Sequence, residues 1–345
     1  MKLMNIYFNR CFTQTSKIIE LIQSNDEGRK FKIFISHSTK NNYLESVSDY
    51  FEVEPQVEQK ELKGEAYVNY CLNFCKTHEI DIFIPRNQVT TLIKYKQEFE
   101  KIGVKTMFIG DFDAYDILND KIKTAEILKD TNVVLIPLTF KIDNINDYQS
   151  AYAKIKETGS SACMKPIVGI GGNGFKKISE DISELSEIYN TNAFTISKEH
   201  LDKVLSSNDK IEPFLMSEYM EDNEYSIDCL SKNGELVIAV PRRKVDRYRQ
   251  NIEYVEKLIE ISRRVTKFFN LSYLYNIQVK YHHGKIYLIE VNTRMSGGLH
   301  KACLTGVNFP YLAIKLLLDE KIELPKTINY NFQLYVTNDF EIKQL

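Results

Sequence analysis

The side chains best suited to chemistry gather in residues 271–298. Gln278 stands in one segment of alternating apolar and polar residues, and Glu290, Asn292 and Arg294 follow at a spacing of two. In an extended chain this spacing places the last three on the same face. Carboxylate and amide oxygens are ligands that Mg²⁺ accepts, and a neighbouring arginine can hold a transferring phosphoryl group. The pattern predicts a metal site or, as the alternative, the solvent-facing polar edge of a hairpin.

A β-hairpin is the element expected to position these groups. Residues 272–280 alternate as a half-buried strand does, residues 282–284 (His-His-Gly) interrupt the pattern, and residues 285–291 resume it. We therefore expect two antiparallel strands joined by a tight turn, with Gln278 on the first strand and Glu290 on the second.

A glycine cluster in residues 161–178 forms the second candidate site. Four of the chain's 14 glycines fall within six residues, namely Gly169, Gly171, Gly172 and Gly174. Glycine lets backbone N–H groups close over phosphate oxygens, and Lys165 on the preceding strand can add a positive charge. The spacing differs from a Walker A loop. A strand, a phosphate-binding loop and a second strand are predicted, and a simple mobile turn is the alternative.

A third candidate site follows the apolar strand predicted at 214–219. Glu218, Tyr219 and Met220 end that strand, and an acidic connection with Glu224 follows. Backbone groups at such a strand end can meet the edge of an adenine ring, while a carboxylate holds ribose hydroxyls. For Glu221 and Asp222 we favour the alternative, that they are solubilising loop charges. After residue 230, Asn-Gly at 233–234 predicts a two-residue hairpin turn.

The first 115 residues alternate between strand and helix patterns, which predicts a parallel sheet flanked by helices. The expected strands and helices, in chain order, are 3–8, 16–22, 32–35, 67–77, 80–84, 92–102 and 106–109. Arg10 lies at the carboxyl end of the first strand, beside a helix start at 13–16, where a carboxylate or phosphate can bind. The alternative is that Thr13 or Thr15 caps the helix and Arg10 is solvated.

A basic run occupies residues 241–249 and is followed by a predicted amphipathic helix over 252–269. The run is interpreted as a solvated face, or as substrate contacts through Arg242 and Arg243. An RNA contact is less favoured, because Tyr248 is the one aromatic residue in the run and the net charge of the chain is −2.

Composition bounds the class of protein. The chain has 345 residues, of which 43% are hydrophobic, and this predicts two or three subdomains. We expect no membrane span, no signal peptide and a cytoplasmic location. The six cysteines lie in apolar surroundings without a CxxC pair, which indicates reduced core residues and not a zinc site.

Four motifs in order resemble the ATP-grasp family, in the branch that contains carbamoyl-phosphate synthetase large subunits and biotin carboxylase. They are NDK at 119–121, MKPIVGIGGNG at 164–174, SEYMEDNEYSIDCL at 217–230 and NIQVKYHHGKIYLIEVNTR at 276–294. The resemblance implies an α/β ATP-grasp fold preceded by a Rossmann-like domain. The Rossmann-like domain would span residues 1–115, the small lid subdomain of the ATP-grasp fold 116–215, and its large subdomain 216–345. The pieces FNRCF, SHST and EP at 54–55 also resemble ATP-grasp proteins of tellurite-resistance gene clusters.

The resemblance implies a role for each motif. Lys121, Lys165 and the glycines at 169–174 would contact the ATP phosphates. Residues 218–220 would lie at the adenine, and Glu224 would bind ribose. Gln278, Glu290 and Asn292 would hold one or two Mg²⁺ ions, with Mn²⁺ as an alternative, and Arg294 would steady an acyl-phosphate transition state. Candidates for substrate contacts are Arg10, Arg242, Arg243, Ser296 and Gly297.

The expected activity is that of an ATP-dependent ligase. ATP would phosphorylate a substrate carboxylate, and an amine would displace phosphate from the acyl phosphate, releasing ADP. Such chemistry depends on positioning and charge neutralisation more than on a protein nucleophile. The alternative is an ATP-binding sensor or regulatory subunit without turnover. We expect the chain to bind small-molecule substrates and to form a homodimer. We expect it to bind neither nucleic acid nor a membrane.

Overall fold

The computed structural model describes residues 3–40, 42–58, 60–169, 172–183, 185, 194–208, 210–246 and 248–337. The chain divides into two compact units, each assembled from separate stretches of sequence. The first unit comprises residues 1–116, 226–276 and 292–345, and the second comprises 117–225 and 277–291. The three-domain division expected from the sequence stays a prediction.

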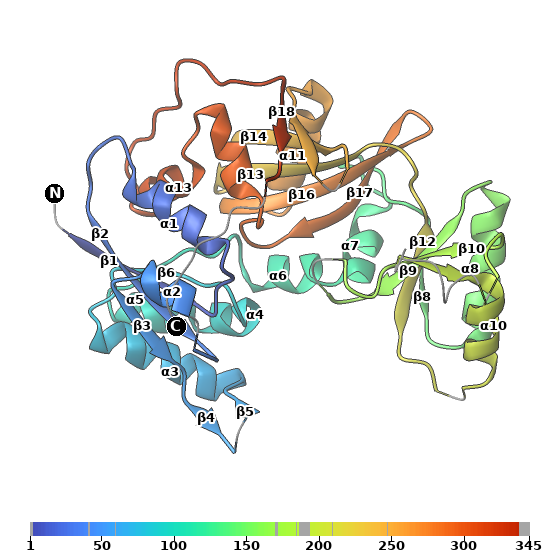
Figure 1. Cartoon of the computed structure of the whole chain (residues 1–345), viewed down its shortest axis with the longest axis horizontal. Coiled ribbons are helices and arrows are strands. Elements are labelled where there is room, and N and C mark those ends of the chain that lie inside the picture. Colours follow the sequence, from blue (N-terminus) through green and yellow to red (C-terminus); the bar gives the residue numbers. More distant parts are fainter. Residues whose placement is uncertain are drawn as a thin grey trace. The chain divides into compact units, whose positions relative to one another are not determined.

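The first unit contains the predicted parallel sheet (Figure 1). Its strands, in the order in which they lie side by side, are β3 (Tyr50–Val53), β2 (Phe31–His37), β1 (Met4–Asn9), β6 (Ile82–Ile84) and β7 (Lys105–Thr106). Every pairing in this sheet is parallel. A separate two-stranded hairpin, β4 (Gln56–Val57) and β5 (Lys60–Glu61), was not predicted from the sequence.

The helices of this part of the chain are α1 (Thr15–Gln23), α2 (Asn42–Ser46), α3 (Gly64–Thr77), α4 (Val89–Leu92), α5 (Lys96–Lys101) and α6 (Phe112–Leu118). The single helix predicted over 92–102 is wrong, because a 3₁₀ turn at Ile93–Tyr95 separates α4 from α5. Tyr95 there leaves the helical backbone region, with φ −112° and ψ 23°.

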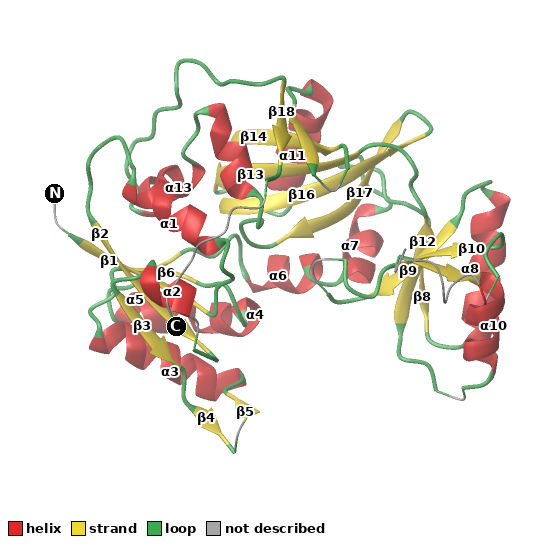
Figure 2. Ribbon diagram, viewed as in Figure 1, coloured by secondary structure: helices red, strands yellow, loops and turns green. Residues whose placement is uncertain are grey.

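Alternating residues of β1 show how the sheet is buried on both faces. Ile6 and Phe8 belong to a core that includes residues of α1 and of α13 (Phe309–Leu317). Tyr7 points the other way and stacks on Phe74 of α3, with ring centroids 4.2 Å apart. Since side chains of a strand alternate between its faces, the two layers of helices cover opposite sides of the sheet (Figure 2).

The second unit contains a five-stranded sheet. Its order is β11 (Thr195–Ser197), β10 (Lys176–Ser179), β9 (Ala162–Pro166), β12 (Phe214–Glu218) and β8 (Thr139–Ile142). The helices of this unit are α7 (Lys121–Leu128), α8 (Ile145–Glu157) and α10 (Lys198–Ser206), and α8 and α10 share one apolar core with the sheet. The helix predicted over 182–189 falls mostly outside the described residues.

A six-stranded sheet includes the predicted hairpin and has residues in both units. Its order is β17 (Lys285–Asn292), β16 (Tyr273–His282), β13 (Glu224–Lys232), β14 (Glu235–Lys244), β15 (Arg249–Ile252) and β18 (Phe332–Tyr335). The predicted turns are present, with Asn233 and His283 in the left-handed region and a left-handed glycine after each. The strand–turn–strand prediction for residues 272–291 is thus confirmed.

The helix predicted over 252–269 begins later than expected. Helix α11 spans Glu256–Phe268, because Ile252 ends strand β15 and is paired with both β14 and β18. Phe268, the last residue of this helix, is 44% exposed. The remaining short elements are α12 (Leu299–Ala302) and a 3₁₀ turn at Cys303–Thr305.

All six cysteines are buried and free, as predicted. Within the described ranges, none of the helices has the length and apolar character needed to cross a bilayer.

Candidate active site

The N-terminus of α7 places Lys121 beside two of the predicted motifs. The Asp120 carboxylate caps the helix by accepting the N–H groups of Ile122 and Lys123, at 2.8 and 3.1 Å. This cap fixes Lys121 as the first helical residue. Its Nζ donates to the carbonyl of Gly169 at 3.2 Å and lies 3.8 Å from Oε2 of Glu290. The structure therefore joins the NDK motif, the glycine loop and the hairpin within the second unit.

Lys165 faces the same place from the sheet. It lies on β9, opposite Leu215 of β12, and lines a small cavity of about 30 Å³ together with Lys121 and Glu290. Burial lowers the pKa of Lys165, and the nearby Lys121 charge adds to this effect, whereas Cys163 and Glu290 oppose it. The cavity holds about one water molecule, so a nucleotide would need space beyond it. Two amines and one carboxylate nevertheless converge there.

The glycine loop folds back on the end of β9. Gly174 has φ +74°, and a Cβ on it would lie 2.8 Å from Pro166 Cγ, so both the backbone conformation and the close packing require glycine. Gly172 is also left-handed, with φ +72°, and its carbonyl accepts the N–H of Phe175 at 3.1 Å. Gly171 lies outside the described residues. The strand, loop and strand predicted here are confirmed, and phosphate binding by the loop stays a prediction.

The segment after β12 is held by its own hydrogen bonds. The Glu218 carboxylate accepts the N–H of Leu138 at 2.8 Å and the hydroxyl of Ser160 at 3.4 Å. The N–H of Tyr219 donates to the carbonyl of Ser161 at 2.7 Å. Because the Glu218 side chain is occupied in this way, we expect adenine to meet backbone groups of 218–220. Glu224 opens β13 and is partly exposed, and its ribose contact stays a prediction.

Lys280 belongs to this region and was missed in the sequence. It lies on β16 two residues after Gln278, hence on the same face of the strand. Its Nζ donates to the carbonyl of Met220 at 2.8 Å and lies 4.9 Å from the centre of the Tyr219 ring. Lys177 approaches the same ring at 4.6 Å. In the sequence, the spacing of two residues between Gln278 and Lys280 was the signal that could have identified Lys280 as a site residue.

The predicted metal ligands come from two neighbouring strands. Gln278 lies on β16, Glu290 and Asn292 lie on β17, and Asn292 is the last residue of that strand. Among the described residues, no group of three or more His, Cys, Asp or Glu side chains is suited to hold a metal. The predicted set has one carboxylate and two amides, which matches a Mg²⁺ ion that takes its other oxygens from nucleotide phosphates.

The position of Arg294 differs from the expected one. It follows the end of β17 in a bend, so it does not continue the alternation of Glu290 and Asn292. Its guanidinium lies 5.9 Å from the centre of the Phe12 ring. The expectation that all three share a face of one extended segment is wrong for Arg294.

Arg10 is buried, and the helix that follows it has no side-chain N-cap. It is 8% exposed, with φ 41°, and its Nε and Nη1 donate to Glu54 and Glu61 at 2.5 and 2.9 Å. Helix α1 has Gln14 at its N-cap position and no side-chain cap, so the alternative reading of Thr13 or Thr15 is also wrong. Arg10 ties β1 to the β4–β5 hairpin, and a direct substrate contact by it stays a prediction.

Arg86 was missed and lies at the carboxyl end of β6. Its backbone N–H donates to Oδ1 of Asn9, at the end of the neighbouring strand β1, at 2.6 Å. Its two Nη atoms are each 3.4 Å from the carbonyl of Met295, and its Nε is buried with no hydrogen-bond partner. Burial, and then the charge of Arg294, lower the pKa of Arg86 to about 10. The positive charge of Arg294 is thus close enough to act on Arg86.

Arg242 lies inside the first unit and not on a solvated face. It is 4% exposed, and its Nε donates to Oδ2 of Asp228 at 2.7 Å. Ser296 joins the pair by donating to Oδ1 of Asp228 at 2.6 Å. A Cβ on Gly298 would lie 2.7 Å from Nη1 of Arg242. The buried pair thus holds the loop that follows Arg294.

The other two substrate candidates differ in exposure. Arg243 is partly exposed and its Nε donates to Glu253 at 2.9 Å. Gly297 is exposed, and a Cβ built on it would have no described atom within 4 Å. A substrate contact by either residue stays a prediction.

Known proteins share the architecture of this chain and part of its sequence pattern. The structure is similar to N5-carboxyaminoimidazole synthetase from Staphylococcus aureus, with a TM-score of 0.65, 12% identity, and coverage of 96% of this chain and 81% of that one. It is also similar to a biotin carboxylase complex from Campylobacter jejuni, with a TM-score of 0.64, 15% identity, and coverage of 95% and 74%. The family described as "ATP-grasp in the biosynthetic pathway with Ter operon" matches residues 210–339.

The chain has the ATP-grasp fold, and its residues 210–339 match an ATP-grasp family. Its sequence relatives include the carbamoyl phosphate synthase large chain of Clostridium acetobutylicum, 25% identical over 313 residues. That alignment covers 86% of this chain and 27% of the relative. This ATP-grasp chain therefore spans about a quarter of the length of the curated relatives it matches. Its sequence relatives include carbamoyl phosphate synthase large chains and its structural neighbours include biotin carboxylases, the two groups that the motifs resemble.

Proposed function

We propose that this ATP-grasp protein is an ATP- and Mg²⁺-dependent ligase that releases ADP and phosphate. In this reaction the γ-phosphate of ATP passes to a substrate carboxylate, and an amine then displaces phosphate from the acyl phosphate to form an amide. The observation that carries the proposal is the convergence of Lys121 and Lys165 with Glu290 at one cavity of the second unit. Two ammonium groups beside one carboxylate suit a triphosphate and its cation.

Residues of the proposed active site would bind and orient ATP. Lys121 and Lys165 would each form charged hydrogen bonds to phosphate oxygens, and the glycine loop would add backbone N–H groups. Gln278, Glu290 and Asn292 would hold Mg²⁺, which when bound neutralises charge on the phosphates. Lys280 would brace the adenine segment through the carbonyl of Met220. These groups position and stabilise charge, as phosphoryl transfer requires.

The position of Arg86 in the first unit supports the proposal of an acidic substrate. In the sheet order β2, β1, β6, the chain leaves β1 and β6 in opposite directions, and such a switch point is where ligands bind in open α/β sheets. Arg86 stands at this point with an unpartnered buried Nε, and Arg294 is the largest nearby charge acting on it. An anion bound at Arg86 would offset the unfavourable effect of the Arg294 charge on it. A substrate carboxylate is the anion that the proposed reaction needs.

The experiment that tests the proposal measures ADP and phosphate release from purified protein with Mg-ATP. Carboxylic acids are paired in turn with amines and with ammonia, and each product is weighed by mass spectrometry. Release that depends on one pair, with a product lighter by one water than the sum of the two substrates, is the expected result. Tight ATP binding without release for any pair would favour the sensor alternative.

The variant Glu290→Gln and the control Glu235→Gln separate the site from the fold in this assay. Glu235 is exposed at the start of β14, so its change leaves turnover intact, whereas Glu290→Gln abolishes it. The homodimer and the cytoplasmic location expected from the sequence also stay predictions.

A further inference from the structure

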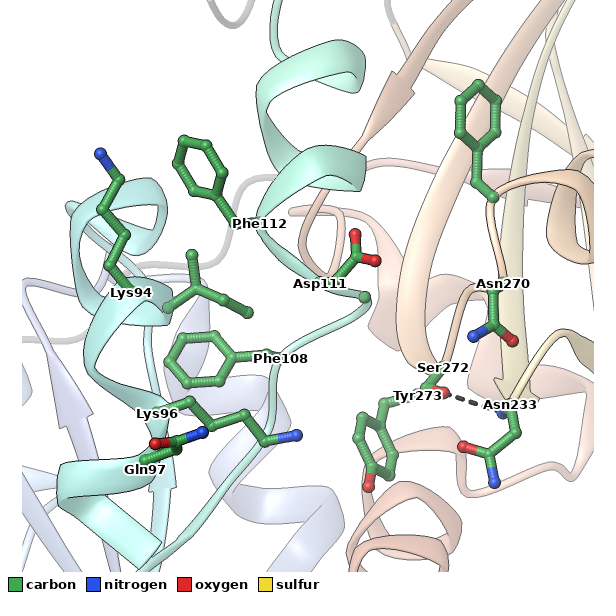
Figure 3. Close-up of a pocket in the computed structure, with 13 residues that line it drawn as sticks. Lys94, Lys96, Gln97, Phe108, Asp111, Phe112, Asn233, Asn270, Ser272 and Tyr273 are labelled. Carbon is green, nitrogen blue, oxygen red and sulfur yellow. Dashed lines mark hydrogen bonds between the residues drawn. The ribbon is translucent and has the colours of Figure 1, made fainter.

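A second pocket lies within the first unit and contains none of the residues of the proposed active site. Its volume is about 520 Å³, and its lining includes Lys94, Lys96, Phe108, Asn233, Asn270 and Tyr273. This volume falls within the range of about 300–1,000 Å³ that is usual for small-molecule sites. Figure 3 shows the two lysines on one wall and the two asparagines on the opposite wall. The pocket has the size of a ligand site and no assigned role.

Hydrogen bonds tie the walls of this pocket together. The N–H of Asn233, in the β13–β14 turn, donates to Oγ of Ser272 at 2.8 Å (Figure 3). The N–H of Ser272 donates to the carbonyl of Ile109 at 2.6 Å, and the N–H of Ile109 donates to the Tyr115 hydroxyl at 3.0 Å. Three segments distant in sequence are thus fixed to one another. A pocket with walls held in this way is preorganised for a ligand.

The charged groups of the lining favour an anion. Lys94 lies 4.5 Å from the centre of the Phe112 ring, and Lys96 lies 3.7 Å from exposed Glu100, a pairing that contributes little in water. Asp111 is the one carboxylate among the described residues of the lining, and its Oδ1 is occupied by the N–H of Ala114 at 2.9 Å. Lys96 extends toward the middle of the pocket, whereas the Lys94 ammonium points away from Asp111 and lies beside the Phe112 ring (Figure 3). The carboxylate of Asp111 already caps α6.

The uncharged lining suits a planar ring. Phe108, 4% exposed, contributes an apolar ring to the lining, and Tyr273 adds a second ring. Tyr273 has φ +57°, a left-handed conformation that is unfavourable for a bulky residue and is often found at binding sites. The amide side chains of Asn233 and Asn270 can both donate and accept hydrogen bonds at the edge of a ring.

We propose that this pocket binds a small organic anion that carries a planar ring. The anionic group lies at Lys96, the ring lies against Phe108 and Tyr273, and the ring edge reaches the two asparagines. A phosphate ester of a ring compound and an aromatic carboxylate share this chemistry. The site is separate from the ATP site, so the inference does not depend on the proposed reaction.

The test is calorimetric titration of the full chain with two groups of probes, nucleoside monophosphates and aromatic carboxylates, in the presence of excess Mg²⁺ and a non-hydrolysable ATP analogue. The variant Lys94→Gln/Lys96→Gln removes both charges, and Lys101→Gln, exposed on the same helix α5, is the matched control. Asn270→Gly removes one amide while allowing the left-handed backbone. The expected result is a Kd at least 10-fold higher in the double variant, unchanged in the control, and raised in Asn270→Gly.

Three outcomes would overturn the inference. The first is that no probe of either group binds the wild-type chain at millimolar concentration. The second is equal binding by the wild type and the double lysine variant, particularly if Lys165→Ala abolishes it, since the probe would then occupy the ATP site. The third is that inorganic phosphate or acetate binds as tightly as the ring compounds. Stronger binding by one group of probes identifies the source of the anion.

Discussion

Nζ of Lys121 lies 3.8 Å from Oε2 of Glu290, and the two side chains are 13% and 21% exposed. One residue begins a helix and the other lies near the end of β17, so the contact exists only in the folded second unit. An ammonium and a carboxylate in this arrangement partly neutralise one another, and each can exchange its partner for a phosphate oxygen or a cation. The first predictions concern this cluster.

Glu290→Gln is expected to remove nearly all ADP formation, because an amide is a much weaker Mg²⁺ ligand than a carboxylate. Thermal unfolding of the variant should match that of the wild type, since Glu290 is not in the apolar core. Near wild-type turnover in this variant would remove Glu290 from the metal site.

Lys165→Ala is expected to weaken ATP binding by about 1.5–3 kcal/mol, the value of one charged hydrogen bond. This corresponds to a Kd about 10- to 150-fold higher, measured by equilibrium binding of a non-hydrolysable analogue. Lys176→Ala, on the partly exposed start of β10, is the control for loss of a charge near the loop. An unchanged Kd for Lys165→Ala would indicate that its role is structural.

The pH dependence of ATP binding should report the lowered pKa of Lys165. A lysine binds phosphate in its protonated form, and burial lowers its pKa from the ordinary 10.5. Affinity for ATP should therefore fall with rising pH, starting at a lower pH than that at which an ordinary lysine deprotonates. Lys165→Arg, which keeps its charge, should shift the fall to higher pH or abolish it. Identical profiles for the two proteins would assign the titration to another group.

Arg86→Ala is expected to raise the KM for the acidic substrate about 10- to 150-fold, with the Kd of ATP unchanged, because one charged contact is worth about 1.5–3 kcal/mol. Arg86→Lys should recover part of the loss, since an ammonium keeps the charge without the fork of donors. KM is measured by steady-state kinetics with the carboxylic acid that the ADP-release screen identifies, and the Kd of ATP is measured separately by equilibrium binding. If ATP binding weakened equally, Arg86 would be supporting the fold and not the substrate.

Arg242→Ala should destabilise the protein by about 3–5 kcal/mol, because it leaves Asp228 buried without its guanidinium. The double variant Arg242→Met/Asp228→Leu should be much less destabilised than the single variant, as no buried charge remains. Urea unfolding of both variants measures this difference. A small effect of Arg242→Ala alone would mean that Asn276 and Ser296, which also donate to Asp228, satisfy the carboxylate.

Local patterns in the sequence determined much of the fold and the ATP-binding motifs. The hairpin at 272–291, the capped start of α7 and the glycine loop each depend on neighbouring residues: strand alternation, an aspartate before a helix, and glycines where φ is positive. These features follow from backbone geometry and can be predicted without knowing what packs against them. The order of the motifs along the chain then indicated the ATP-grasp superfamily.

Only the tertiary structure decided which charged groups are buried and what they meet. Arg10 and Arg242 looked solvated because their partners, Glu54 and Asp228, stand 44 and 14 residues away. Ile252 looked helical because the strand β18 that pairs with it is about 80 residues later. Arg86 and the pocket beside Tyr273 carry no local signal of function, since each depends on segments brought together by folding. Lys280 has one weak local signal, its spacing of two from Gln278. Short-range geometry is encoded within a few residues, whereas a binding site depends on which distant segments meet.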